Sequence, residues 1–213
     1  MPPSPHKVMR ALSAVADERR ESAADLWLNT QVPKILRGIC QKYADDIDGF
    51  MSGNGLDGAK VAKVKDYLAE PTQFLILHGP KGTGKTALSS WIGYQLVEDA
   101  SARLFSLPDM INKLSTLPFE QRHALQTLVN EADLLVLDDI GAADSTLTAF
   151  QHKAIWSLID ERYKNPDLIT ILTTNLAVFH EEEESLVKWC GDSAWDRISS
   201  SLTRVHMTGE SLR

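Results

Sequence analysis

The feature that most constrains this chain is a loop of the form GxxxxGK[ST] that joins a short apolar run to a helix-forming stretch. The apolar run is FLILH at residues 74–78, and the loop follows directly as GPKGTGKT at residues 79–86. Glycines let such a loop wrap closely around a phosphate, so that successive N–H groups and the following helix N-terminus point at the anion. Because a strand precedes the loop and a helix follows it, the sequence predicts a nucleotide phosphate loop.

Different residues of this loop are expected to contact different parts of a bound nucleoside triphosphate. Lys85 is expected to reach the β and γ phosphates, and the Thr86 hydroxyl is expected to ligate Mg²⁺. The residues expected to contact the nucleotide are Gly79, Pro80, Lys81, Gly82, Thr83, Gly84, Lys85, Thr86 and Ala87. The expected cofactors are therefore ATP and Mg²⁺.

Short, continuous apolar runs alternate with helix-like stretches beyond Pro71, which is typical of a parallel sheet buried on both faces. The apolar runs are residues 74–78, 102–107, 134–138 and 168–174, and the helix-like stretches are residues 86–99 and 150–163. Right-handed crossovers of this βαβ kind place a ligand site at the carboxyl ends of the strands. The sequence therefore predicts an α/β fold of the P-loop NTPase class.

Polar residues follow two of these runs at the predicted carboxyl edge of the sheet. LLVLDDIG brings Asp138 and Asp139 to that edge, and LITILTTN brings Asn175. Asp138 would hold Mg²⁺, Asp139 would polarise the water that attacks the γ phosphate, and Asn175 would orient that water and sense the γ phosphate. Thr173 and Thr174 are alternatives for the last role. Each acid or amide could instead be a turn or cap residue.

The N-terminal part of the chain is predicted to be helical. Residues 1–31 have a proline-rich tip and then apolar residues at three-to-four spacing among charges, which predicts an amphipathic helix on a short arm. Residues 32–51 predict a second helix with Pro33 in its first turn. The expected organisation is a helical arm over 1–31, for partner binding, and one ATPase domain over 32–213.

Composition limits the partners and the compartment. The net charge of −7 argues against a generally basic protein that coats nucleic acid, so any DNA contact is expected to be local. Cys40 and Cys190 form no motif with zinc-ligand spacing, and we expect no structural metal and a reducing compartment. No apolar run reaches the roughly 18 residues that span a bilayer. The expected location is the cytoplasm, with no membrane partner.

Four stretches give this chain a resemblance to a known group of ATPases. They are GPKGTGKT, LLVLDDIG, IWSLIDERYKN and ILTTNL, and the closing GESLR is similar to the GESYR of many members. Together they resemble the AAA+ ATPases of the DnaC/IstB group, which includes bacterial and phage helicase loaders and transposition helpers. The resemblance covers about residues 32–213. It implies an AAA+ sheet of five parallel strands between helices, with a minimal C-terminal lid because few residues follow Asn175.

In this group a box of the form RIxSRL carries an arginine that reaches the ATP of a neighbouring subunit. The matching stretch, residues 197–202, keeps Arg197 and has Ser201 where the second arginine is expected. An arginine finger is worth about 10³ to 10⁵ in rate in GTPases, so this departure predicts slow hydrolysis unless another residue substitutes. Arg197 and Arg204 are the candidates, and each could equally be an exposed arginine paired with nearby acids.

The resemblance implies an ATPase that binds single-stranded DNA, assembles with a replicative helicase and forms a homo-oligomer on ATP or DNA. Its expected setting is a bacterial cell or a phage-infected bacterium. The leading hypothesis is a helicase loader for DNA replication whose arm binds the helicase. A transposition helper uses the same nucleotide chemistry, but such helpers commonly carry a longer basic N-terminal region. A regulatory module that binds ATP with little hydrolysis is a third hypothesis, supported by Ser201.

Overall fold

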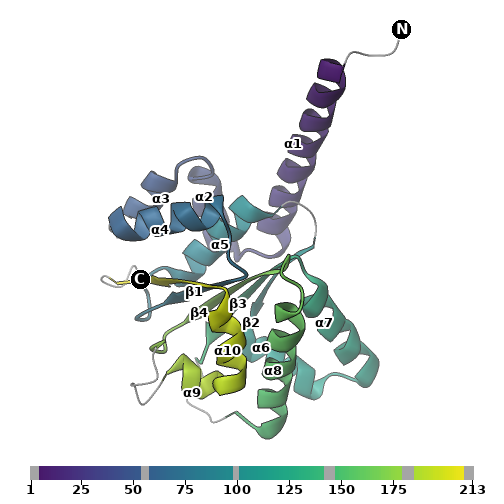
Figure 1. The fold of residues 1–213 in the computed structure, drawn as a ribbon, viewed down its shortest axis with the longest axis vertical. Coiled ribbons are helices and arrows are strands. Elements are labelled where there is room, and N and C mark those ends of the chain that lie inside the picture. The colour runs from purple at the N-terminus through teal and green to yellow at the C-terminus, as the bar shows by residue number, and fades with distance from the viewer. Residues whose placement is uncertain (1–4, 54–57, 98–100, 142–146, 179–184, 209–213) are drawn as a thin grey trace.

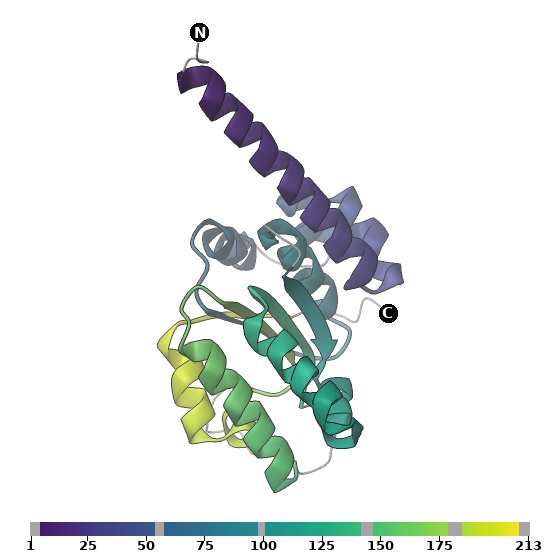
Figure 2. The same ribbon diagram turned by 90° about the vertical axis from the view of Figure 1, so that its right-hand side faces the viewer.

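A computed structural model describes residues 5–53, 58–97, 101–141, 147–178 and 185–208. These residues form a parallel five-stranded sheet with helices on both faces (Figures 1 and 2). The strands are β1 (Phe74–His78), β2 (Ala102–Ser106), β3 (Leu134–Ile140), β4 (Ile169–Thr174) and β5 (Leu202–His206). The helices are α1 (Pro5–Thr30), α2 (Lys34–Lys42), α3 (Ile47–Gly53), α4 (Gly58–Ala69), α5 (Lys85–Leu96), α6 (Leu107–Thr116), α7 (Phe119–Glu131), α8 (Ala149–Tyr163), α9 (Leu186–Cys190) and α10 (Asp192–Ser200).

The strand order is β2-β3-β4-β1-β5, and every pairing is parallel. The α/β prediction and the five parallel strands are confirmed. Continuous apolar character located the first four strands to within two residues at each end, because both faces of the inner strands are covered by helices. Their carboxyl ends all lie along one edge of the sheet, where the phosphate loop begins.

The fifth strand is in a segment that sequence analysis had not assigned to the sheet. β5 spans residues 202–206, beginning at the last residue of the arginine box, and pairs only with β1. It is an edge strand in which only Val205 is buried. Its short, mixed sequence LTRVH carries no continuous apolar run, so the periodicity that identifies the inner strands is missing here.

The single helix predicted over residues 32–51 is wrong, because the structure has two helices there. α2 ends at Lys42, and Tyr43 takes a non-helical backbone conformation with φ −111°. A second helix starts after Asp46, whose carboxylate accepts the Gly49 N–H at 2.8 Å in the manner of an N-cap. The Trp91 indole donates to the Tyr43 carbonyl at 2.9 Å and so fixes the break against α5.

Two hydrophobic cores lie on the two faces of the sheet. One is built by α1 to α5 against Leu75 and Leu77 of β1, and the other by α6 to α10 against Phe74 and Ile76. Alternation along β1 therefore sends one apolar pair into each core, as expected for a strand buried on both faces.

Helix α1 leaves the sheet domain and extends toward the N-terminus, as Figures 1 and 2 show. The C-terminal part of α1 packs against the domain. Trp27 and Leu28 are each 1% exposed within the core that also contains α5, and the Trp27 indole donates to the Ser90 carbonyl at 3.0 Å. Gly93 of α5 makes room for that ring, since a Cβ there would lie 2.4 Å from it. The last turns of α1 are therefore part of the domain core, while the division into an arm and a domain at residue 31 stays a prediction.

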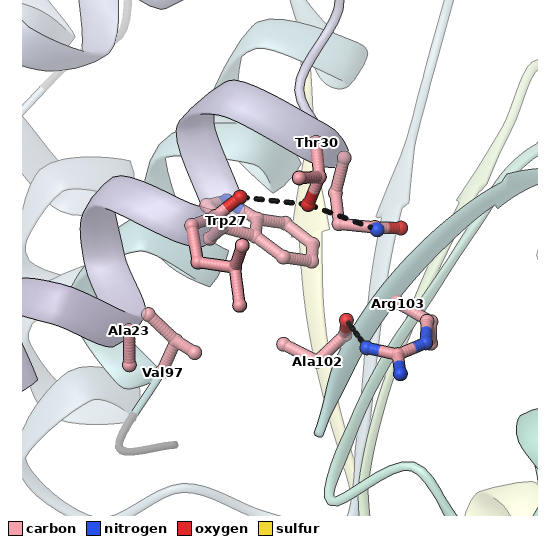
Figure 3. Close-up of a pocket in the computed structure, with 8 residues that line it drawn as sticks. Ala23, Trp27, Thr30, Val97, Ala102 and Arg103 are labelled. Carbon is pink, nitrogen blue, oxygen red and sulfur yellow. Dashed lines mark hydrogen bonds between the residues drawn. The ribbon is translucent and has the colours of Figure 1, made fainter. Parts of the chain in front are cut away.

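A small cavity marks where the end of α1 meets the edge strand β2 (Figure 3). Trp27 and Thr30 line it from α1, and Ala102 and Arg103 line it from β2. The Gln31 side chain accepts the Leu104 N–H at 3.2 Å. Because an edge strand presents unpaired backbone groups, this contact covers part of the β2 edge.

Arg162 of α8 holds the amino-terminal ends of the strands, at the end of the sheet opposite the phosphate loop. Its side chain is fully buried, and its guanidinium donates to Thr170 and to main-chain carbonyls on α7, before β3 and on β4. Burial lowers the pKa of Arg162 to about 10, and the charge of Asp133 opposes that shift. Gln73, just before β1, donates to the carbonyls of Arg162 and Asn165. A buried cation satisfied by so many acceptors holds these strand starts in place.

Among the described residues, no helix combines the length and the apolar character needed to cross a bilayer.

The packing of Trp27 predicts its contribution to stability. Replacing Trp27 with Ala should lower the free energy of unfolding by about 3–5 kcal/mol, because a buried ring and its hydrogen bond are lost. Urea denaturation followed by circular dichroism measures this value. Trp156→Ala is the matched control, since Trp156 is 39% exposed, and it should cost about 1 kcal/mol or less. Equal losses in both variants would contradict the anchoring role of Trp27.

Candidate nucleotide-binding site

The phosphate loop connects β1 to α5 and has the backbone shape that its glycines permit. Gly79, Gly82 and Gly84 have φ angles of 141°, 87° and 85°. A side chain at Gly79 would not fit, because a Cβ would lie 2.0 Å from the carbonyl oxygen of Met207. Gly84 is the N-cap of α5, and Ala87 is buried in the first turn. The N–H groups at the start of α5 therefore face the loop, which is suited to an anion.

Lys85 lies inside this loop. Its ammonium donates to the carbonyl oxygens of Gly79 at 2.8 Å and Pro80 at 2.7 Å, and the residue is 7% exposed. The Thr83 hydroxyl also donates to the Pro80 carbonyl, at 2.9 Å. Lys81 is exposed. The positive charge of Lys85 is therefore held by the loop itself, which concentrates positive potential where phosphate oxygens would lie.

Three oxygen-bearing side chains meet beside the loop, and they come from α5, β3 and β4. Thr86 Oγ1 lies 3.1 and 3.0 Å from the two carboxylate oxygens of Asp138, and Thr173 Oγ1 donates to Asp138 Oδ1 at 2.6 Å. Burial raises the pKa of Asp138, while the hydrogen bonds from Thr173 and Thr86 lower it. Hydroxyl and carboxylate oxygens are the ligands that Mg²⁺ prefers. The two residues predicted to hold the metal lie in direct contact.

Asp139 has a left-handed backbone conformation, with φ 62°, and no other non-glycine residue in the described part of the chain has a positive φ. Its N–H donates to Thr173 Oγ1 at 3.0 Å, and the pairing of β3 with β4 shifts register between Leu137 and Ile140. Such a conformation costs about 1–3 kcal/mol and persists only where the surroundings enforce it. The irregularity leaves the Asp139 side chain exposed at this end of the sheet, next to the half-buried Asp138.

Asn175 follows the last residue of β4 at the same edge. Thr174 pairs with His78 of β1 on one side and with Ile140 of β3 on the other. The Thr174 carbonyl accepts the Gly79 N–H at 3.2 Å, so Asn175 stands beside the start of the loop. The partly buried Asn175 therefore lies between the loop and the acid pair. This placement follows from the position of β4 between β1 and β3.

Arg197 lies at the opposite edge of the sheet. It is in α10, just before Ser201, whose side chain accepts the Gln73 N–H at 3.2 Å beside the start of β1. The Arg197 Nε donates to Asp160 Oδ1 at 2.5 Å, and its guanidinium lies 5.5 Å from the centre of the Trp156 ring. Within one chain Arg197 is an ion-paired residue, and Ser201 has a structural contact of its own.

A pair of histidines beside the loop was missed by sequence reasoning. His78 ends β1, and His206 is its register partner on β5. Their rings are stacked, with centroids 4.6 Å apart and an interplanar angle of 7°. Burial lowers the pKa of His78 to about 4, and the positive groups of His206, Arg204, Lys63 and Lys85 add to the effect. A histidine that ends an apolar run directly before the first loop glycine was the available signal.

The sequence model of the IstB-like ATP binding proteins matches residues 28–213. This chain belongs to that family. An insertion sequence IS21-like ATP-binding protein of Bacteroides fragilis is 29% identical over 108 residues, which are 49% of this chain and 41% of that protein. The IstB-like chain therefore matches less than half the length of this curated relative.

Solved structures agree on the fold. The DnaC helicase loader has a TM-score of 0.56 and 25% identity, covering 70% of this chain and 89% of its own. DnaI has a TM-score of 0.57 and 20% identity, covering 70% and 84%. The replication initiator DnaA bound to AMPPCP and single-stranded DNA has a TM-score of 0.55 and 18% identity, covering 72% and 46%. The chain has the P-loop AAA+ fold of these proteins, and the predicted DnaC/IstB resemblance is confirmed. The GESLR stretch, residues 209–213, lies outside the described part, and the minimal C-terminal lid stays a prediction.

The lowered pKa of His78 predicts how stability depends on pH. The unfolded chain binds a proton at His78 near pH 6.5, whereas the folded chain does so only near pH 4. Stability is therefore present above pH 6.5 and is lost as the pH falls toward 4. Between pH 7 and 5, His78→Gln should lose about 1 kcal/mol less than the wild type in urea unfolding, after allowing for solvent screening of a half-buried ring. His123→Gln, at an exposed position on α7, should follow the wild type.

Proposed function

We propose that this chain is an ATP-controlled helicase loader that binds Mg-ATP at the phosphate loop and delivers a replicative helicase to single-stranded DNA. It would act in the cytoplasm of a bacterial cell or a phage-infected bacterium. The observation that carries the nucleotide part of the proposal is the contact of Thr86 with Asp138 directly beside the Lys85 ammonium. The loader part is supported by the similarity to the DnaC helicase loader over most of that protein's length.

Binding would use the loop, the start of α5 and one lysine. The loop N–H groups and the positive end of α5 would face the phosphates, and Lys85 would exchange the carbonyls of Gly79 and Pro80 for phosphate oxygens. Thr86 and Asp138 would hold Mg²⁺, which when bound neutralises charge on the β and γ phosphates. Thr173 would keep the Asp138 carboxylate oriented, since it already donates to one of its oxygens.

Hydrolysis would use the residues at the carboxyl ends of β3 and β4. The exposed Asp139 carboxylate would accept a hydrogen bond from the attacking water, and the Asn175 amide would orient that water. Arg197 lies at the other end of its own sheet, so it could serve only the nucleotide of a neighbouring copy in a homo-oligomer. To reach that nucleotide it would have to leave Asp160. Slow turnover follows from this arrangement unless assembly releases that arginine.

The arm gives the proposal a place for the partner. α1 extends from the domain (Figure 1) while Trp27 fixes its base, so the outer turns can meet another protein without loosening the ATPase core. An amphipathic helix presented in this way suits docking into a groove of a partner. We assign the arm to the replicative helicase and the domain to ATP and single-stranded DNA.

A transposition helper is the second candidate. It is favoured by the 29% identity with an IS21-like ATP-binding protein, and the family itself is IstB-like. Both candidates would use the same nucleotide site and would differ in the protein with which they act, a replicative helicase or a transposase. A regulatory module that binds ATP with little turnover is the third, and the pairing of Arg197 with Asp160 is consistent with it.

The nucleotide site can be tested with two substitutions. Lys85→Ala should raise the Kd for Mg-ATP by about 10²-fold or more, because the charge inside the loop is lost. Asp139→Asn should bind Mg-ATP within about threefold of the wild type and lower turnover by about 10²-fold, within the range for general-base catalysis. Isothermal titration calorimetry and phosphate release measure the two quantities. Lys113→Ala, an exposed lysine on α6, serves as the charge-matched control, and unchanged turnover in both site variants would refute the catalytic assignment.

The choice of partner is a separate prediction. Native mass spectrometry of this protein with the replicative helicase of its source should show a defined complex that forms or rearranges on adding Mg-ATP. The same measurement with a transposase gives the competing outcome. A folded, nucleotide-bound protein that forms a complex only with the transposase would replace the loader by the transposition helper.

A further inference from the structure

Two stacked imidazole rings lie where the edge strand β5 meets the start of the phosphate loop. Parallel pairing puts His78 opposite His206, and the rings are 4.6 Å apart at 7° to each other. His206 is exposed, whereas its neighbours Val205 and Met207 are buried in the core. The strand is therefore fixed by residues on either side of His206, and the outward ring is not needed to fill the core.

The end of β5 is in contact with the loop. A Cβ at Gly79 would lie 2.0 Å from the Met207 carbonyl oxygen and 3.4 Å from Cδ2 of His206. The Met207 N–H also donates to the His78 carbonyl at 2.7 Å. The histidine stack consequently borders the first residue of the anion-binding turn.

The sheet order gives the bound nucleotide a direction, and this step rests on the proposed function. Asp139 and Asn175, at the ends of β3 and β4, mark where the γ phosphate would lie. The order β3-β4-β1-β5 then leaves the remainder of the nucleotide to extend past β1 toward β5. Three strand spacings of about 4.8 Å separate β3 from β5. That span is comparable with the length of an extended nucleoside triphosphate.

We infer that the exposed ring of His206, backed by His78, is the stacking platform for the purine base of the bound nucleoside triphosphate. A purine offers a π face of the same kind as the imidazole, and stacking of a base on an aromatic side chain is favourable and tolerant of base identity. His78 supports His206 from behind, so the platform is formed before the nucleotide binds. Because His78 stays neutral at physiological pH, the stack carries no charge repulsion from that ring.

The test compares two probes that differ in having a base. Binding of Mg-ATP and of Mg-tripolyphosphate is measured by calorimetry for the wild type, His206→Ala and His206→Phe. His206→Ala should weaken Mg-ATP binding about fivefold or more, at the low end of what loss of a base–aromatic stack costs, and leave tripolyphosphate binding unchanged. His206→Phe should bind Mg-ATP within about twofold of the wild type, because the ring is kept. His123→Ala, an exposed histidine stacked on Phe119 of α7, is the matched control.

The outcomes separate this inference from the proposed function. Equal weakening for both probes in His206→Ala would mean general damage to the loop and would overturn the base platform. Unchanged Mg-ATP binding in His206→Ala, or a loss in His206→Phe as large as in His206→Ala, would overturn it as well. If the folded wild type bound neither probe, the proposed nucleotide function would fail instead.

Discussion

The pairing of β1 with β4 on one side and β5 on the other is the constraint on which the rest of this structure depends. It places the phosphate loop between the end of β4, with Asn175, and the end of β5, with His206. The neighbouring β3 adds the acid pair, and one hydroxyl of β4, that of Thr173, contacts both Asp138 and the Asp139 N–H. Because all the strands are parallel, every one of these groups reaches the same edge.

The opposite end of the sheet, where the strands start, stabilises the fold. There Arg162 and Gln73 satisfy the backbone groups that surround the starts of β1, β3 and β4, and Ser201 accepts the Gln73 N–H where β5 begins. A buried guanidinium is costly to desolvate, so its full set of acceptors makes the arrangement specific as well as stable. The strand ends that carry the site are thus positioned from the far side of the sheet.

The family and the fold of this chain are shown, whereas its partner is a proposal. An IstB-like family and an AAA+ fold follow from a match over residues 28–213 and from the structural neighbours. In the proposed function α1 selects the partner, since its base is fixed by Trp27 while its outer turns project from the domain (Figure 2).

The sequence by itself determined the phosphate loop, the four apolar strands and the residues that end them, because a glycine-rich turn and a strand buried on both faces have local patterns. It did not locate β5, whose edge position needs no continuous apolar run, nor the break at Tyr43, which depends on Trp91 far along the chain. Only the tertiary structure decided that Thr86, Asp138 and Thr173 form one network, that Arg197 pairs with Asp160, and that His78 stacks on His206. The physical reason is that such contacts are set by strand order, and strand order is decided by long-range packing that no local pattern encodes.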